Sequence, residues 1–210
     1  MLSRNFLNKT VAPALVSFSL LGGTNTAARA QIRAGVQLGV VTSSDLLQDS
    51  IVSPITLGPN STFFAGLALD TEIDRRFRVG AALRVSRSDL VSRSPGDTNT
   101  VATLTIWHPS AILSHQLGPW LAAEAGVGVL IYKPDRRTGT IFSAGTPIEP
   151  VVGLALSGTR RLGRLISISL DLGYDVHRFS TQRLQTVGFK GKTTVHRVSL
   201  SLTLRRISGE

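Results

Sequence analysis

Hydrophobic and polar residues alternate without interruption through the segment ISISLDLGYDV, residues 166–176. Ile, Leu, Tyr and Val occupy every second position, and Ser, Asp and Gly occupy the positions between them. A period of two predicts a β-strand with one apolar face and one polar face. The same alternation occurs in eight segments, at residues 31–41, 62–73, 77–86, 100–114, 120–133, 148–157, 164–178 and 194–206. The chain is therefore predicted to be all-β.

The connections between these segments alternate in length. Those after the first, third, fifth and seventh segments hold 20, 13, 14 and 15 residues, whereas those after the second, fourth and sixth hold 3, 5 and 6. In an antiparallel up-and-down arrangement, the long connections then all emerge at one end and the short ones at the other. Each segment has about the length of a membrane-spanning strand, ~9–11 residues, or somewhat more. This rhythm predicts an eight-stranded antiparallel up-and-down transmembrane β-barrel.

The polar faces are crowded with small residues. They carry no Lys in the first four, the sixth and the seventh segments, and they hold the glycines at positions 35, 39, 66, 80, 126, 128, 153 and 173. An eight-stranded barrel has just enough room inside for side chains, so small residues belong in its lumen. The polar face is therefore predicted to point inward and the aliphatic face toward lipid. The alternative is a soluble periplasmic lipocalin-like ligand-binding barrel, which would carry these glycines on its outer surface, where they weaken strands without a gain in packing.

The first thirty residues have the pattern of a secretory signal. They contain basic residues, an apolar run at 11–21 and a closing ARA sequence. The run is shorter than the ~20 residues that a membrane-spanning helix needs. We therefore expect residues 1–30 to be a signal peptide cleaved after Ala30, leaving residues 31–210 as a single barrel domain.

Charge and composition narrow the partners. The formal net charge is +10, and it is +7 for residues 31–210, because the first thirty residues hold three basic residues and no acid. The arginine pairs are scattered over turns, loops and the tail without interleaved aromatic residues, so nucleic acid is not expected as a partner. The chain has no Cys, which excludes disulfides and thiolate ligands. The four histidines, His108, His115, His177 and His196, lack metal-ligand spacing, and neither a metal nor a cofactor is expected.

With this signal, these eight segments and this loop rhythm, the chain resembles the small eight-stranded outer-membrane β-barrel family of Gram-negative bacteria. The resemblance covers residues 31–210 and rests on architecture rather than on a diagnostic peptide. It implies residence in the outer membrane among its lipids, insertion by the outer-membrane assembly machinery, periplasmic termini and short turns, and long loops outside the cell. One feature departs from the family: the chain ends in LTLRRISGE, without the aromatic residue with which such barrels usually end.

Some barrels of this architecture are enzymes, and one constellation here could carry chemistry. The sequence WHPS holds His108 and Ser110, and a 115–119 turn centred near Leu117 would set Glu124 opposite Ser110. That loosely resembles outer-membrane lipid A deacylases and would imply a lipid-modifying hydrolase. Against it, Pro109 predicts a bulge, and strict alternation before it turns His108 toward lipid. A nucleophile also needs its base within hydrogen-bond reach, so the sequence favours a protein with no catalytic residues.

The leading functional hypothesis is a non-enzymatic, monomeric barrel. It would have an envelope-structural role or bind a ligand or adhesion partner through its surface loops, which is where such scaffolds carry binding. Conduction is not expected, because lumens of this strand number are normally filled and porins use ~16–18 strands. The first long connection is apolar enough to fold over the barrel or to meet a partner, through Leu46, Leu47, Ile51, Val52 and Ile55.

The shortest connection, 74–76, also predicts a register. It sets Glu72 opposite Arg78 on the lumen face and Ile73 opposite Phe77 on the lipid face. Facing residues in an antiparallel pair lie ~4.5–5.5 Å apart at Cβ, close enough for an ion pair.

Overall fold

The computed structural model describes residues 32–49, 55–135, 147–163, 165–179 and 193–207. The predicted signal peptide, its cleavage after Ala30 and the last three residues lie outside this part of the chain. No helix in the described ranges is long and apolar enough to cross a membrane. The strands are β1 (Ile32–Ser43), β2 (Leu47–Asp49), β3 (Ile55–Pro59), β4 (Thr62–Glu72), β5 (Phe77–Ser94), β6 (Asp97–Gln116), β7 (Leu121–Pro134), β8 (Ile148–Arg161), β9 (Ile166–Phe179) and β10 (Thr193–Ile207).

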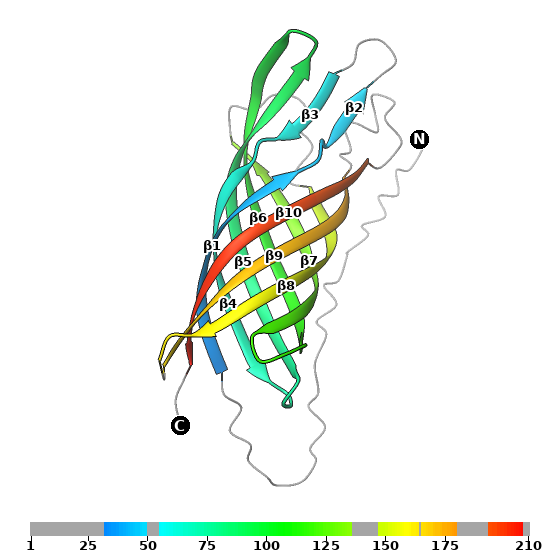
Figure 1. Cartoon of the computed structure of the whole chain (residues 1–210). Coiled ribbons are helices and arrows are strands. Elements are labelled where there is room, and N and C mark those ends of the chain that lie inside the picture. Colours follow the sequence, from blue (N-terminus) through cyan, green and yellow to red (C-terminus); the bar gives the residue numbers. More distant parts are fainter. Residues whose placement is uncertain (1–31, 50–54, 136–146, 164, 180–192, 208–210) are drawn as a thin grey trace, which may run out of the picture.

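Eight of these strands close into a barrel (Figure 1). Their order is β5-β4-β1-β10-β9-β8-β7-β6, and β6 pairs back onto β5 to complete the ring. Neighbouring strands are antiparallel throughout. The predicted eight-stranded up-and-down barrel is confirmed. We call the end with the connections 73–76, 117–120 and 162–165 the turn end, and the opposite end the loop end.

The loop end is more ordered than the sequence predicts. The segment 87–99 is not a loop, because β5 and β6 continue through it as a paired hairpin that turns at Gly96, whose φ is 85°. The ladder shifts by one residue between Leu90 and Val91, a β-bulge, and then resumes. Strands β2 and β3 lie within the first long connection, and β3 adds to the projecting edge of β5. These elements form a β-structure that extends the barrel at its loop end (Figure 1).

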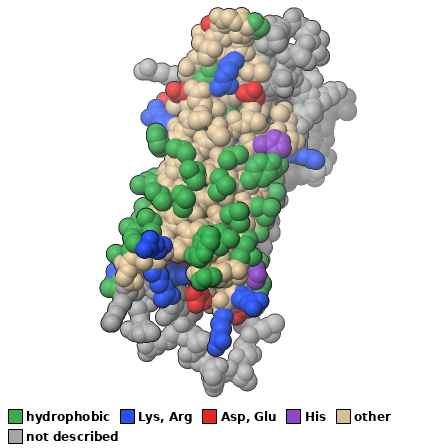
Figure 2. Space-filling model, in the orientation of Figure 1, with side chains coloured by type: hydrophobic (Ala, Val, Ile, Leu, Met, Phe, Trp, Pro, Cys, Tyr) green, Lys and Arg blue, Asp and Glu red, His purple; other side chains and the backbone are tan. Residues whose placement is uncertain are grey.

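The outer surface carries a continuous apolar band. Leu38, Val127 and Leu154 are 60%, 62% and 66% exposed on the outer face, whereas Ser169 and Thr203 are fully buried inside. Figure 2 shows hydrophobic side chains covering the middle of the barrel wall. A water-soluble barrel buries its aliphatic face, so the lipocalin-like alternative is wrong. The aliphatic face is lipid-facing, as expected for a transmembrane barrel.

Aromatic side chains mark both edges of this band. Phe63, Trp107 and Tyr174 point outward toward the loop end, and Phe77 and Trp120 point outward at the turn end. Amphipathic and aromatic rings prefer the two membrane interfaces, where membrane barrels carry their girdles. The band between the two girdles therefore defines the membrane-spanning part.

Beyond the loop-end girdle the two faces exchange character. In the β5–β6 hairpin, Leu90, Leu104 and Ile106 are buried inside, while Arg87 and Asp89 are exposed outside. A wall that is polar outside and apolar inside is the pattern of a sheet in water. The hairpin therefore projects out of the bilayer.

Candidate functional site

The lumen is the part of the molecule where polar side chains gather, and ion pairs are concentrated at its turn end. Asp70 forms an ion pair with Arg33 and lies 3.1 Å from Arg205 Nε through its second oxygen. Glu72 Oε1 lies 3.6 Å from Arg33 Nη1 and 3.3 Å from Arg78 Nε. Three cations and two carboxylates from β1, β4, β5 and β10 thus form one network. It lines the interior of these four adjacent strands near the turn-end girdle.

Above this network, Asp171 is held by neutral donors. Ser157 Oγ and Thr203 Oγ1 donate hydrogen bonds to its two oxygens, at 2.5 and 2.6 Å. Arg205 Nη1 donates to Ser169 Oγ at 2.7 Å and so connects the Asp171 level to the ion pairs below. A carboxylate buried away from water needs such partners, because an unpaired one is costly.

On the side of the lumen opposite Asp171, the interior is filled by Arg84 of β5. Its Nε donates to Gln37 Oε1 at 2.9 Å, and Gln37 Nε2 donates to Ser201 Oγ at 2.9 Å. The Arg84 guanidinium carbon also lies 5.6 Å from the centroid of the Phe64 ring, within the range of a cation–π contact. This chain of contacts crosses the barrel from β5 through β1 to β10.

The three residues considered for catalysis line one small internal cavity but do not form a triad. Glu124 faces Ser114 across the β6–β7 ladder and accepts its hydroxyl hydrogen bond at 3.0 Å, whereas Ser110 faces Gly128. The prediction that Glu124 lies opposite Ser110 is wrong by four residues, or ~13 Å along the strand. His108, Ser110 and Glu124 share a cavity of about 30 Å³, which is about the size of one water molecule.

The expected orientation of His108 is also wrong. His108 is 5% exposed and points into the lumen, while Trp107 beside it faces outward. The sequence misleads here because Leu104 and Ile106 share the inward face with His108, although aliphatic residues elsewhere face lipid. Pro109 makes no bulge, since the register is the same on both sides of it. It lies where the ladder to β7 is interrupted, a position at which proline leaves no broken hydrogen bond.

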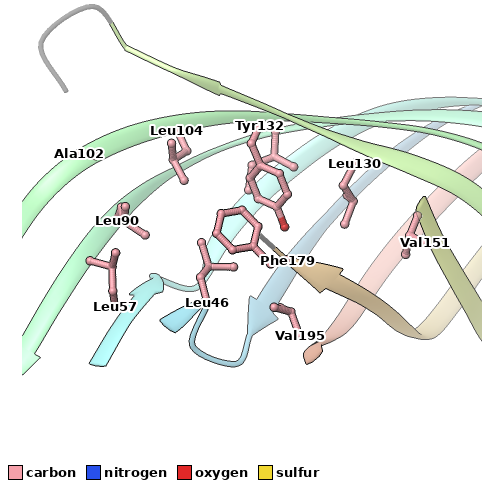
Figure 3. Packing of buried hydrophobic residues seen from close by; sticks show 11 residues of the cluster. Leu46, Leu57, Leu90, Ala102, Leu104, Leu130, Tyr132, Val151, Phe179 and Val195 are labelled. Atoms are coloured by element: carbon pink, nitrogen blue, oxygen red, sulfur yellow. The ribbon is translucent and has the colours of Figure 1, made fainter. Parts of the chain in front are cut away.

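An apolar plug closes the loop end of the lumen (Figure 3). Its members come from the first connection, from the β5–β6 hairpin and from β7 to β10, and several are completely buried. They are Leu46, Leu57, Leu90, Ala102, Leu104, Ile106, Leu130, Tyr132, Val151, Phe179 and Val195. Of the two alternatives for the first connection, folding over the barrel or meeting a partner, Leu46 follows the first, since it is 1% exposed within the plug; Ile51 and Val52 lie outside the described residues.

Tyr132 joins the plug to the polar lumen below. Its hydroxyl lies 2.7 Å from His177 Nε2, and its ring meets Phe179 edge-on at 5.3 Å between centroids. An aromatic ring with one polar tip fits such a boundary, because the ring packs in the apolar layer and the hydroxyl finds a partner.

The plug is the part of the site that the sequence prediction missed. Its signal was present in the outward-facing neighbours of the plug residues, which are polar: Thr103 and Thr105 flank Leu104, and Lys133 follows Tyr132. An apolar residue between polar neighbours faces inward wherever the wall stands in water. In the described parts of the chain, no three His, Asp or Glu side chains gather as a metal site would require.

No protein-family model matches the chain, and no curated protein matches it. Several solved structures are similar. Outer membrane protein AlkL, determined by solid-state NMR in DMPC bilayers, is 11% identical over 90% of this chain and 96% of AlkL, with a TM-score of 0.53. Neisserial surface protein A is 13% identical over 84% of this chain and 96% of its own, with a TM-score of 0.49.

OprG from Pseudomonas aeruginosa is 11% identical over 86% of this chain and 98% of its own, with a TM-score of 0.48. At such identities a structural similarity defines only a fold. The similarity to AlkL, together with the apolar band, shows that this chain has the fold of the small eight-stranded outer-membrane β-barrels.

Proposed function

We propose that this protein is a non-enzymatic outer-membrane barrel with a sealed lumen, which serves as a structural scaffold in the envelope and presents its loop end to the cell exterior for binding. The observation that carries the proposal is the double closure of the lumen. The Arg33–Asp70 network lies at the turn end of the lumen, and the apolar plug around Leu104 and Tyr132 fills the loop end. An eight-stranded barrel filled in this way holds no continuous water path.

The first test is electrical. The refolded protein is inserted into planar lipid bilayers, and insertion is verified by its heat-modifiable mobility in detergent gels. We expect no conductance steps from the wild type. Regular steps of uniform size would contradict the sealed lumen, and recovery of the protein in the soluble periplasmic fraction of cells would contradict residence in the outer membrane.

The binding role rests on the order of the projecting structure. Arg93 of the β5–β6 hairpin contacts two residues of the first long connection. Its Nη1 lies 3.1 Å from Asp45 Oδ1, and its Nη2 donates a hydrogen bond to Asn60 Oδ1 at 2.9 Å. These contacts tie the first connection to the β5–β6 hairpin. A pre-ordered surface loses less conformational entropy when it binds a partner than a loose loop does. The loop end is therefore suited to act as a recognition surface.

This role can be tested without knowing the ligand. Leu90 and Ala102 are cross-strand partners, so a two-residue Asn-Gly turn can replace residues 91–101 without disturbing the barrel. Cells displaying the wild type and the shortened variant are compared on a glycan array and on a panel of immobilised purified proteins. Binding that is specific to the wild type supports the role. Equal binding by both variants, or none by the wild type on either array, contradicts it.

A further inference from the structure

The lipid-facing wall contains a groove near the turn end, on the side formed by β8, β9 and β10. It has a volume of about 470 Å³, and its walls are the Trp120 ring on one side and Leu170 and Leu202 on the other. Ile168 and Gly158 lie between these walls. Apart from Arg160 at its rim and Thr159, the lining is apolar or bare backbone. The groove belongs to neither the lumen nor the projecting loop end.

Gly158 creates the hollow. It occupies an outward-facing position on β8, between Leu156 and Arg160, where the rest of the band carries a side chain. A Cβ placed on Gly158 would meet nothing closer than the Leu170 carbonyl oxygen, 3.9 Å away. The glycine is therefore not required by crowding, unlike most of the lumen glycines.

The backbone of Trp120 is anchored beside the groove. Its carbonyl oxygen accepts a hydrogen bond of 2.7 Å from the Thr159 backbone N–H, which ties the β6–β7 turn to β8. The Trp120 side chain remains 63% exposed beside the groove. Trp120 belongs to the turn-end aromatic girdle, and tryptophan at such a girdle lies at the interface between lipid headgroups and acyl chains.

Arg160 lines the groove, and a second arginine, Arg206, lies beyond the lining residues toward the turn end. Arg160 on β8 faces Ile168 on β9, and Arg206 on β10 faces Ile166 on β9, so one strand separates them. The two positions are also offset by two residues along the strands, so their backbones are about 12 Å apart. No described carboxylate lies within ion-pair distance of either. Figure 2 shows basic side chains at this end of the barrel, below the hydrophobic band.

We propose that this groove binds one anionic glycerophospholipid, with an acyl chain against Gly158 and Leu170 and the phosphate between Arg160 and Arg206. The groove is apolar where acyl chains lie, and its cations stand where headgroups lie. A basic cluster next to an apolar membrane surface attracts anionic lipid. The inference rests on the proposed residence in a bilayer and deepens it by naming a lipid class.

A second copy of the chain fits this surface less well. Packing two copies face to face would bring the arginines of both against each other, and the outward positions of β8, β9 and β10 in the described ranges hold no Asp or Glu to pair with them. Buried charges without partners are costly. A lipid phosphate supplies the missing negative charge.

The test uses the refolded protein in phosphatidylcholine liposomes with or without phosphatidylglycerol, followed by detergent extraction and native mass spectrometry. We expect the wild type to retain one phosphatidylglycerol and to prefer it over phosphatidylcholine. The Arg160→Gln/Arg206→Gln variant should lose about tenfold or more of this preference, since each cation near a membrane surface contributes to the attraction. Gly158→Leu should lose the bound lipid while keeping both cations, because it fills the groove.

Two matched controls separate this site from general effects. Ala81→Leu adds a similar bulk to the lipid face of β5, on the opposite side of the ring, and Arg178→Gln removes an outward cation at the loop end. Both should retain the lipid. Glycerol phosphate added in solution should not displace it, which distinguishes a lipid from a free phosphate.

Three results would overturn the inference: equal retention of both lipids by the wild type, undiminished retention by Gly158→Leu and by the arginine variant, or a dimer in place of the lipid adduct. Heat-modifiable mobility is recorded for every sample. If the protein fails to insert at all, the proposed membrane residence fails with it. If it inserts but selects no lipid, only this inference fails.

Discussion

Arg78 Nε lies 3.3 Å from Glu72 Oε1, and the two residues are direct cross-strand partners in the β4–β5 hairpin. This register was predicted from the length of the 74–76 connection alone and is confirmed. The pair is not isolated, because Arg33 Nη1 also lies 3.6 Å from the same Glu72 oxygen. Glu72 is therefore shared by two cations at the turn end of the lumen.

The first prediction concerns the coupling within this pair. Glu72→Ala and Arg78→Ala should each destabilise the barrel in urea, and the double variant should lose less than the sum of the two. The Glu72 side chain is 45% exposed, so we expect a coupling energy of about 1 kcal/mol or less, below the ~3–5 kcal/mol typical of fully buried pairs. Arg75→Ala, in the exposed turn, serves as the control that should leave stability unchanged. Strict additivity would show that the two side chains do not meet in solution.

Asp70 should matter more than Glu72. Its side chain is only 16% exposed and it pairs with two cations, Arg33 and Arg205, whose side chains are 10% and 15% exposed. Removing its charge leaves both guanidiniums without their main partner, at a cost of about 3 kcal/mol. Asp70→Asn is therefore expected to lower the free energy of unfolding by more than Glu72→Ala does. Urea titration of both variants in liposomes of the same composition measures the difference. The opposite order would contradict the network as described.

The membrane-spanning wall could be predicted from the sequence because one physical rule applies along its whole length. Every outward position there meets lipid and every inward position meets a crowded lumen, so alternation alone assigns the faces. The rule reverses above the bilayer, and prediction fails there. Leu104 and Ile106 are inside the projecting hairpin, so reading them as lipid-facing turned His108 the wrong way.

The candidate triad failed for a different reason, the position of a turn. Strand β6 remains paired as far as Gln116, and Leu117 N–H donates to the Leu121 carbonyl at 2.9 Å to close the turn. The turn centre thus lies two residues later than expected. Because both strands shift, the residue facing Ser110 changes by four positions, from Glu124 to Gly128. Turn centres depend on backbone hydrogen bonds that residue types alone do not specify.

The plug predicts a specific weakness. Leu104 is completely buried at its centre, and Leu104→Ala should cost about 2–5 kcal/mol through lost burial and the cavity left behind. Leu113→Ala is the matched control, since Leu113 lies on the same strand but is 46% exposed on the lipid face. Urea titration in liposomes should show a clear decrease in stability for Leu104→Ala and a much smaller one for Leu113→Ala. Equal losses would mean that the plug does not form as described.

The β4–β5 turn should respond to acid through Asp74. Its Oδ1 accepts backbone hydrogen bonds from Arg76 N and Phe77 N, at 2.6 and 2.8 Å. These two hydrogen bonds lower the pKa of Asp74 below its ordinary value of 3.8. A lowered pKa means that the ionised carboxylate stabilises the turn above the ordinary value and that this contribution is lost as pH falls through the lowered pKa.

The measurement compares the wild type with Asp74→Asn. We expect the wild type to be the more stable of the two near neutral pH, and the difference in urea midpoint to shrink as the pH falls below 3.8. The carboxyl carbon of Asp74, followed by NMR, should titrate with a midpoint below that of a free aspartate. A midpoint at or above the ordinary value would show that the two backbone hydrogen bonds are not formed.

The final prediction concerns the direction in which the barrel faces. The chain has no Cys, so a single introduced cysteine reports one position without background. Cysteines at Asn60 and Asp97, which are exposed at the loop end, should react on intact cells with a membrane-impermeant maleimide. A cysteine at Gly191, in the last long connection and outside the described residues, is expected to react as well.

A cysteine at Arg160, at the turn end, should react only after the outer membrane is permeabilised, whereas one at Ala111, on the lipid face of β6, should not react in either condition. Labelling of Arg160 but of neither Asn60 nor Asp97 on intact cells would invert the orientation, and labelling of Ala111 would place the middle of the wall in water.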